Sequence, residues 1–211
     1  MPRSAAKSAS LYAVHPSVAM VQKEIADLQP KTGRTLEEWV AIVKKDGPTG
    51  HLARRNWLKS KHKLGNNQVW RIVERAEGKG TWEDSLEEYL AAAVVYVEQQ
   101  YAGKKSPLRP IYDELLKLGK SLGPDVKACP CKTMVPLYRN HVFAQIKPAT
   151  NSRVDFGLCF NTYKGKLPKR LIDTGGLAKK DRITHRIELT HPSQIDADLK
   201  KWLRAAYDLD S

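Results

Sequence analysis

The residues best suited to chemistry in this sequence are cationic side chains between positions 51 and 75. On a helix that begins at His51, steps of four, four and three residues place four of these side chains in one stripe. Others flank the stripe or follow on the next expected helix. The set comprises His51, Arg54, Arg55, Lys59, Lys61, His62, Lys63, Arg71 and Arg75. Cations arranged in this way neutralise phosphates, so the pattern predicts contact with a polyanion.

Residues 51–75, the cationic corner, also have the general form of two helices joined at Gly65. In a helix-turn-helix the second helix enters the major groove of DNA. That helix offers Asn67, Gln68, Arg71 and Arg75 as readers, but it also carries Glu74 and Glu77. Non-specific phosphate contact is therefore favoured over base reading. The alternative remains open that residues 51–75 have only a structural role and that their basic face is simply solvated.

Three cysteines could ligate a metal, but their spacing fits poorly. Cys129 and Cys131 form a C-x-C pair, and Cys159 is distant. Structural zinc requires four ligands at characteristic spacings, and the six histidines lack the i, i+4 spacing of a zincin. We therefore expect buried thiols, no metal and no cofactor.

The sequence contains no phosphate-binding glycine loop of the P-loop type. Asp155 and Glu188 lie on separate expected strands and could face one another, an arrangement that acid–base chemistry could use. We therefore expect a protein that is not an enzyme. The alternative is a small-ligand-binding protein or enzyme with a pocket on the open sheet face near Tyr138, Arg153 and Asp155.

Composition supports a polyanionic partner. The 211 residues carry a formal net charge of +13 and 41% apolar residues. An excess of this size favours DNA, RNA or the ribosome as partner, although solubility alone can also explain it. No apolar run reaches the roughly 20 residues that cross a bilayer, and the basic start lacks the apolar core of a secretory signal. With an odd number of cysteines, these features predict a cytoplasmic protein without a membrane partner; they predict no oligomeric state.

Helical periodicity dominates the first half of the chain. Apolar residues recur at helical spacing over 17–28, and Thr35 with Glu38 forms a capping box that opens a second helix. Two further helices are expected over about 51–63 and 67–76. Together they predict a four-helix all-α module.

After residue 124 the apolar period changes from helical to two. A hairpin is expected around Arg139, followed by strands in "RVDFGLCF" and "RITHRIELT" and a helix over 192–207. Preceding helices and an antiparallel sheet of about four to five strands define an α+β class. The expected divisions are a disordered basic tail over 1–14, a helical domain over 15–78, a connecting helix and linker over 79–107, and an α+β domain over 108–211.

Longer motifs resemble two families. "KTGRTLEEWVAIVKKDG" and "WLKSKHKLG" are similar to the helical domain-of-unknown-function family 4287. "LRPIYDELLKLGKSLGPDV", "VFAQIKPATNSRVDFGL" and "ELTHPSQIDADLKKWLRAAYD" resemble the domain-of-unknown-function family 5655. The corner departs from the first family, because it lacks a second histidine and has Val69 and Trp70 in place of a small residue. The resemblance implies a bacterial two-domain protein and its boundaries, and it transfers no catalytic residue.

Overall fold

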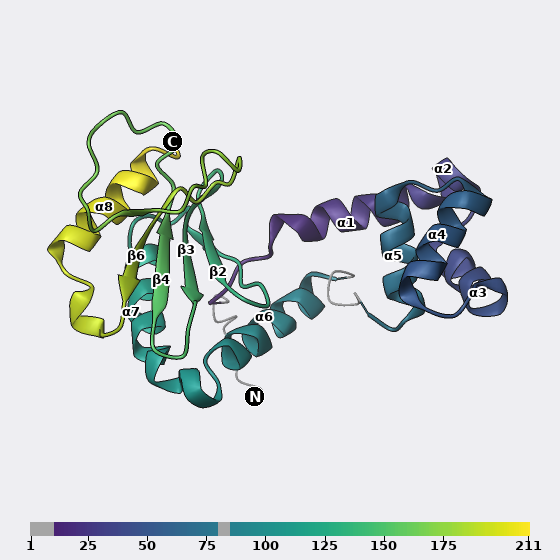
Figure 1. The fold of residues 1–211 in the computed structure, drawn as a ribbon, viewed down its shortest axis with the longest axis horizontal. Helices are drawn as coiled ribbons and strands as arrows, with labels where there is room; N and C mark the ends of the chain where they lie inside the picture. Colours follow the sequence, from purple (N-terminus) through teal and green to yellow (C-terminus); the bar gives the residue numbers. More distant parts are fainter. Residues whose placement is uncertain (1–10, 80–84) are drawn as a thin grey trace, which may run out of the picture. The chain divides into compact units, whose positions relative to one another are not determined.

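A computed structural model of the chain describes residues 11–79 and 85–211. These residues divide into two compact units (Figure 1). The helical domain comprises residues 14–92, and the sheet domain comprises residues 93–211 together with 11–13. The division lies within the long helix α6 (Leu86–Gln100). No helix among the described residues is both long and apolar enough to span a membrane.

Within the described residues, the helical domain has five helices ahead of α6: α1 (Pro16–Ala26), α2 (Leu28–Thr32), α3 (Leu36–Asp46), α4 (His51–His62) and α5 (Asn66–Ala76). Helices α3 and α4 both pack on α5. Their apolar faces meet in a core that includes Trp39, Val43, Leu58 and Ile72, each at most 2% exposed. The capping box at Thr35 is confirmed: Glu38 N donates to Thr35 Oγ1, and Thr35 N donates to Glu38 Oε2.

The helix expected over 17–28 is instead two helices, α1 and α2, separated at Asp27. Helical structure also continues past residue 28. In the structure Pro30 is the third residue of α2, where a missing N–H breaks no intrahelical bond. Gly33, with a φ of 77°, then ends α2.

The sheet domain confirms the α+β class. In chain order after α6 come the 3₁₀ helix η2 (Gly103–Leu108), α7 (Arg109–Lys120), β1 (Lys127–Ala128), β2 (Val135–Tyr138), β3 (Val142–Pro148), β4 (Val154–Leu158), β5 (Ile172–Asp173), β6 (His185–Leu189), η3 (Pro192–Gln194) and α8 (Ala197–Asp208). The described strands form one six-stranded sheet in the order β1-β2-β3-β4-β6-β5. Every neighbouring pair is antiparallel.

Alternation along the strands separates the two faces of the sheet. Phe156 is paired with Ile146 and Ile187, and all three are buried on the face that α7 and α8 cover (Figure 1). Asp155 is paired with Lys147 and Glu188 on the opposite, polar face. The period of two therefore places Lys147, Asp155 and Glu188 on the face away from the helices.

Residues 11–13 differ from the tail expected over 1–14. Tyr12 is buried, and its hydroxyl lies 2.9 Å from that of Tyr112. Ala13 N donates to Ala128 O at the edge strand β1. These contacts anchor the segment on the sheet domain. Residues 1–10 of the expected tail and 80–84 of the expected linker lie outside the described residues.

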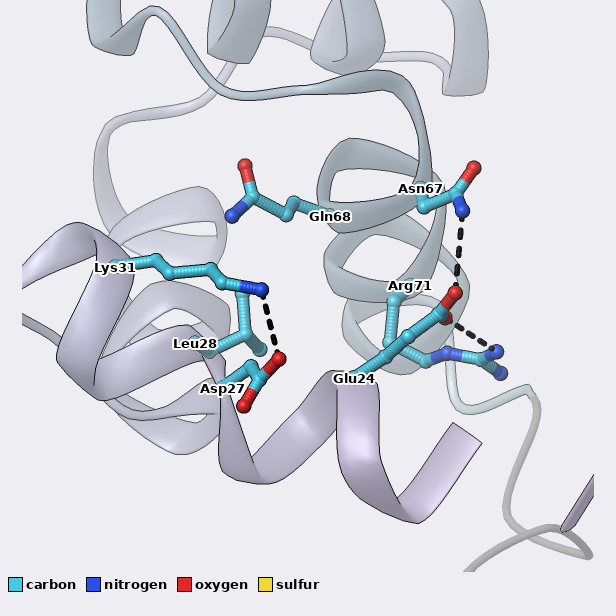
Figure 2. A pocket seen from close by; sticks show the side chains of 7 residues that line it. All are labelled: Glu24, Asp27, Leu28, Lys31, Asn67, Gln68 and Arg71. Atoms are coloured by element: carbon cyan, nitrogen blue, oxygen red, sulfur yellow. Dashed lines mark hydrogen bonds and ion pairs between the residues drawn. The ribbon is translucent and has the colours of Figure 1, made fainter. Parts of the chain in front are cut away.

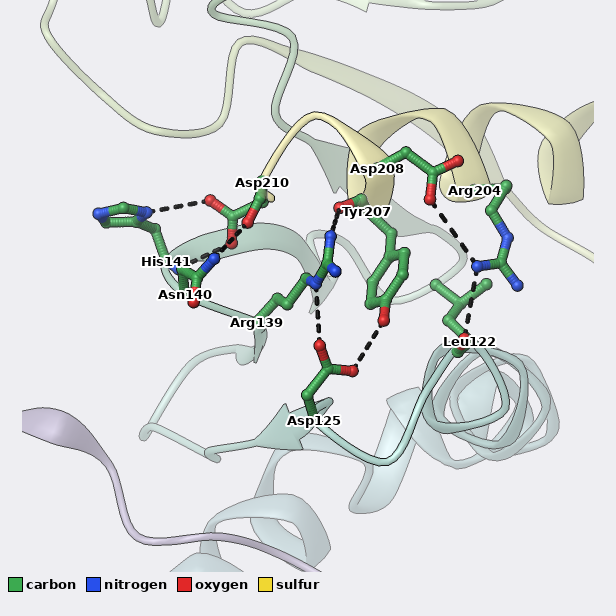
Figure 3. Close-up of polar contacts among 9 residues, drawn as sticks. All are labelled: Leu122, Asp125, Arg139, Asn140, His141, Arg204, Tyr207, Asp208 and Asp210. Atoms are coloured by element: carbon green, nitrogen blue, oxygen red, sulfur yellow. Dashed lines mark hydrogen bonds and ion pairs between the residues drawn. The ribbon is translucent and has the colours of Figure 1, made fainter.

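A buried carboxylate ties the end of α8 to the β2–β3 turn (Figure 3). Asp210, 6% exposed, accepts from His141 N at 2.7 Å and lies 3.1 Å from His141 Nδ1. Arg182 Nη2 donates to the same carboxylate at 2.8 Å. Since a buried carboxylate loses its hydration, these donors are what makes its burial tolerable.

We expect Asp210→Asn to lower the free energy of unfolding of the sheet domain by about 2 kcal/mol, because hydrogen bonds to a charged group are lost or weakened. Asp208→Asn is the matched control. That carboxylate lies 3.8 Å from Arg204 and is 60% exposed, so its loss should change stability by less than about 0.5 kcal/mol. Urea unfolding followed by circular dichroism tests the pair. Equal effects would contradict the proposed role of Asp210.

Candidate anion-binding surface

The structure places much of the cationic corner against the protein rather than in solvent. His51 Nδ1 lies 3.2 Å from Glu77 Oε2, and Arg54 Nη1 lies 3.7 Å from Glu77 Oε1. Arg54 Nε also donates to the carbonyl of Pro48 at 3.1 Å. These two cations therefore join the start of α4 to the end of α5.

His62 is likewise engaged. Its ring packs edge-on against Trp39 and Trp57, with centroids 5.1 and 4.8 Å away. Its Nε2 atom is buried and has no hydrogen-bond partner among the described residues. Burial, reinforced by the charges of Lys61 and Arg34, lowers the pKa of His62, which favours the neutral ring at neutral pH.

Helical geometry explains these contacts. A helix turns about 100° per residue, so positions four or seven residues from Leu58 lie within about 40° of it. Arg54, His62 and His51 occupy these positions, on the core side with Leu58. Leu52 lies about 120° away and is 67% exposed. His51 and His62, two members of the stripe expected from the sequence, therefore lie on the core side of the helix.

The remaining corner cations differ in exposure. Arg71, 5% exposed, lies against the Trp70 ring with Nη2 3.5 Å from Glu24 Oε2. Lys61 and Lys63 are exposed, whereas Arg55, Lys59 and Arg75 are partly buried. The described corner therefore presents only Lys61 and Lys63 as fully exposed cations.

The net charge of the chain is concentrated elsewhere. Residues 14–92 contain 13 Lys and Arg against 11 Asp and Glu, a net charge of +2. Residues 93–211 contain 21 against 12, a net charge of +9. The sheet domain is thus the part of the chain whose field attracts anions.

Four lysines of the sheet domain line one cavity of about 500 Å³: Lys104, Lys105, Lys132 and Lys147. They come from η2, the β1–β2 connection and β3. Among the described residues that line this lysine-lined cavity there is no Asp or Glu. Lys105 Nζ donates to the carbonyl of Pro148 at 2.7 Å, and no ion pair between described residues involves any of the four. Their charge is available to an anionic ligand.

The polar sheet face has the opposite character, because its charges pair with one another. Arg153 lies 2.8 Å from Asp155 and 3.0 Å from Glu188, and Arg186 lies 2.9 Å from Glu188. The structure thus brings Arg153 and Asp155 together, but Tyr138 pairs with Val142 at the far end of β3. The sequence had predicted one pocket near all three residues.

Asp155 does line a separate pocket of about 180 Å³ on this face, with Lys147, Lys179 and Arg186. Residues of the β5–β6 connection, including Thr174 and Ile183, complete it. Lys147 also lines the lysine-lined cavity, so the two hollows share a cationic wall.

The thiols have the properties of buried side chains. Burial, with a smaller contribution from Cys131, raises the pKa of Cys129 to about 12, and burial also raises the pKa of Cys131. Metal binding requires thiolates, so these environments do not favour it. One other group of described residues could hold a cation: His51, Glu74 and Glu77. Lys79 Nζ already lies 2.9 Å from Glu77.

Fold and charge together define a basic α+β protein with a helical domain and a sheet domain. Residues 97–210 match the family model described as Domain of unknown function (DUF5655). The chain belongs to this family. Residues 21–75 match a second model, Domain of unknown function (DUF4287). No curated protein matches the chain, and no solved structure matches it.

We expect the fold to be independent of metal. Incubation with excess EDTA should leave the thermal midpoint unchanged, because burial raises the pKa of Cys129 and Cys131 and Glu77 already has Arg54 and Lys79 as partners. Differential scanning calorimetry before and after dialysis against chelator measures this. A large fall in midpoint would instead identify a structural metal at the cysteines or at His51, Glu74 and Glu77.

His62 should make the helical domain less stable in acid. Its folded-state pKa lies below the unfolded value near 6.5, so the unfolded chain binds the proton more readily between the two pKa values. Stability should therefore fall as the pH drops through about 6.5, and not above it. Urea midpoints from tryptophan fluorescence at pH 7.5 and 5.5 test this. A His62→Gln variant with the same pH dependence as the parent would contradict the assignment.

Proposed function

We propose that the chain is a non-enzymatic binding protein that contacts nucleic acid non-specifically through the lysine-lined cavity of its sheet domain. The observation that carries this proposal is the convergence of four lysines without a carboxylate around one hollow. Nucleic-acid phosphates bind such groups with release of condensed counterions. Contacts of this kind carry no base information, so the expected binding is independent of sequence.

Further lysines lie elsewhere on the sheet domain. Lys164, Lys166, Lys169, Lys179 and Lys180 lie exposed on the connection between β4 and β6. Ammonium groups on flexible stems are strongly hydrated point charges that accept many phosphate geometries. A surface of lysines therefore suits a phosphate backbone whose path varies.

The cationic corner has a secondary role in this proposal. His51, Arg54 and His62 have partners within the helical domain. These side chains are therefore less available to nucleic acid. The corner contributes through Lys61 and Lys63, with Lys59, Arg55 and Arg75 set deeper. A cytoplasmic location, where nucleic acid is abundant, belongs to the same proposal.

The alternative of a small-ligand pocket at Arg153 and Asp155 has less support. These side chains form a closed network with Arg186 and Glu188, in which two cations face two carboxylates. A ligand there must replace ion pairs that are already made. The lysine-lined cavity makes no such demand.

Neutralising the cavity should weaken binding. We expect the triple variant Lys104→Gln, Lys132→Gln and Lys147→Gln to bind a labelled DNA duplex at least tenfold more weakly than the parent at about 0.1 M salt. If each lysine neutralises one phosphate, the slope of log affinity against log salt should become shallower by about 2.7. Fluorescence anisotropy over a salt series measures both quantities.

The matched control is Lys59→Gln, Lys61→Gln and Lys63→Gln, which removes the same charge from the corner. It should reduce affinity by less than the cavity variant, and both should melt like the parent. A larger loss in the control would return the site to the corner. Strong discrimination between duplex sequences by the parent would contradict non-specific binding.

A further inference from the structure

The lysine-lined cavity also has a buried hydrogen-bond acceptor among its lining residues. Gln100, the last residue of α6, lines the cavity and is 6% exposed. Its Nε2 atom donates to the carbonyl of Cys131 at 2.7 Å. Its Oε1 atom is buried and has no hydrogen-bond partner in the part of the chain that the structure describes.

The bond to Cys131 fixes the orientation of the Gln100 amide. A carbonyl accepts hydrogen bonds only, so the NH₂ end of the amide must face it. Turning the amide over would bring two acceptors together. Since a buried acceptor without a donor is destabilising, a ligand that supplies the donor to Oε1 gains affinity.

A cavity of about 200 Å³ in the helical domain provides a contrast, because several of its polar groups pair with one another (Figure 2). Lys31 Nζ donates to Asp27 Oδ2 at 2.7 Å, and Asn67 Nδ2 donates to Glu24 Oε1 at 3.1 Å. The carboxylates there have donors in place, whereas the described residues supply none to Gln100 Oε1. The lysine-lined cavity therefore suits a ligand that brings a donor as well as negative charge.

A nucleic acid has few donors that could meet Gln100 Oε1. Its phosphate and sugar-ring oxygens only accept hydrogen bonds. Base amino groups donate, but they differ from base to base. The ribose 2′-hydroxyl donates at every nucleotide, lies beside the phosphate and is absent from DNA. Of these donors, only the 2′-hydroxyl agrees with contact that is independent of sequence.

The other neutral residues of the cavity are compatible with a sugar–phosphate unit. Gln99, Thr133 and Asn151 line the cavity and are exposed. Side chains of these types commonly bond to sugar and phosphate oxygens. The volume of about 500 Å³ lies within the range of small-ligand pockets, roughly 300–1,000 Å³.

We propose that the lysine-lined cavity binds RNA in preference to DNA, with Gln100 Oε1 accepting a hydrogen bond from a ribose 2′-hydroxyl. The lysines hold the adjacent phosphates. The inference rests on the proposed contact with nucleic acid and specifies which nucleic acid that is.

Three labelled single strands of one sequence test the inference on the full chain: RNA, 2′-O-methyl RNA and DNA. Methylation removes the donor but keeps the 2′-oxygen. We expect RNA to bind at least about fivefold more tightly than either of the others, because only RNA supplies the donor. Fluorescence anisotropy at about 0.1 M salt measures the three affinities.

The outcomes separate this inference from the proposed function. Equal binding of RNA and DNA, or of RNA and 2′-O-methyl RNA, would overturn the role of the 2′-hydroxyl and leave phosphate contact intact. Failure of all three strands to bind would refute the proposed function itself. A preference that changes when the base sequence of the strands is changed would assign the donor to a base.

A variant then assigns the preference to Gln100. Gln100→Leu removes the acceptor, so its affinity for RNA should fall to its affinity for DNA. Gln99→Leu, at the exposed neighbour in the same cavity, is the matched control and should keep the preference for RNA. A Gln100→Leu variant that prefers RNA as strongly as the parent would show that another group distinguishes the sugars. The strand comparison uses the parent alone, so it decides the proposal even where Gln100→Leu loses the bond to Cys131.

Discussion

The pairing of buried cations with carboxylates decides which charges of this protein are structural and which are available to a partner. A guanidinium or imidazolium removed from water is destabilising unless an anion or acceptor replaces its hydration. In the helical domain, Glu77 serves His51 and Arg54, and Glu24 serves Arg71. Nearly equal numbers of acids and bases make this pairing possible, and they also cancel the long-range field of the domain.

The sheet domain follows the same rule with a different result. Two-residue periodicity directs apolar side chains toward α7 and α8 and most ionisable ones toward the other face. On that face Arg153, Asp155, Arg186 and Glu188 form ion pairs with one another. Nine more bases than acids remain over residues 93–211. The surplus is mainly lysine, whose hydrated ammonium stays at the surface while its stem packs. Four of these lysines line one cavity, and the described residues that line it include no carboxylate.

Periodicity and capping chemistry predicted most of the fold, because both depend on local sequence. Thr35 with Glu38 located the start of α3, and alternation from Val154 to Leu158 located β4. Two-residue strands such as β5 are too short to show a period, and the docking of Tyr12 on Tyr112 depends on contacts 100 residues apart. The sequence placed the candidate polyanion site in its densest run of cations, the cationic corner. Lys104, Lys132 and Lys147 are spread over 44 positions, and only folding brings them to one hollow.

Helix α4 shows that a dense run of cationic residues in the sequence does not predict how many of them are accessible to a ligand. Counting from Leu58 in steps of four and seven residues already places Arg54, His62 and His51 on the core side, so the information was present in the sequence. A polar side chain on that side can remain only where an acceptor or aromatic ring lies within reach, and Glu77, Trp39 and Trp57 meet that need. In the sheet domain, by contrast, basic residues outnumber acidic ones by nine, and an excess of this size attracts anions.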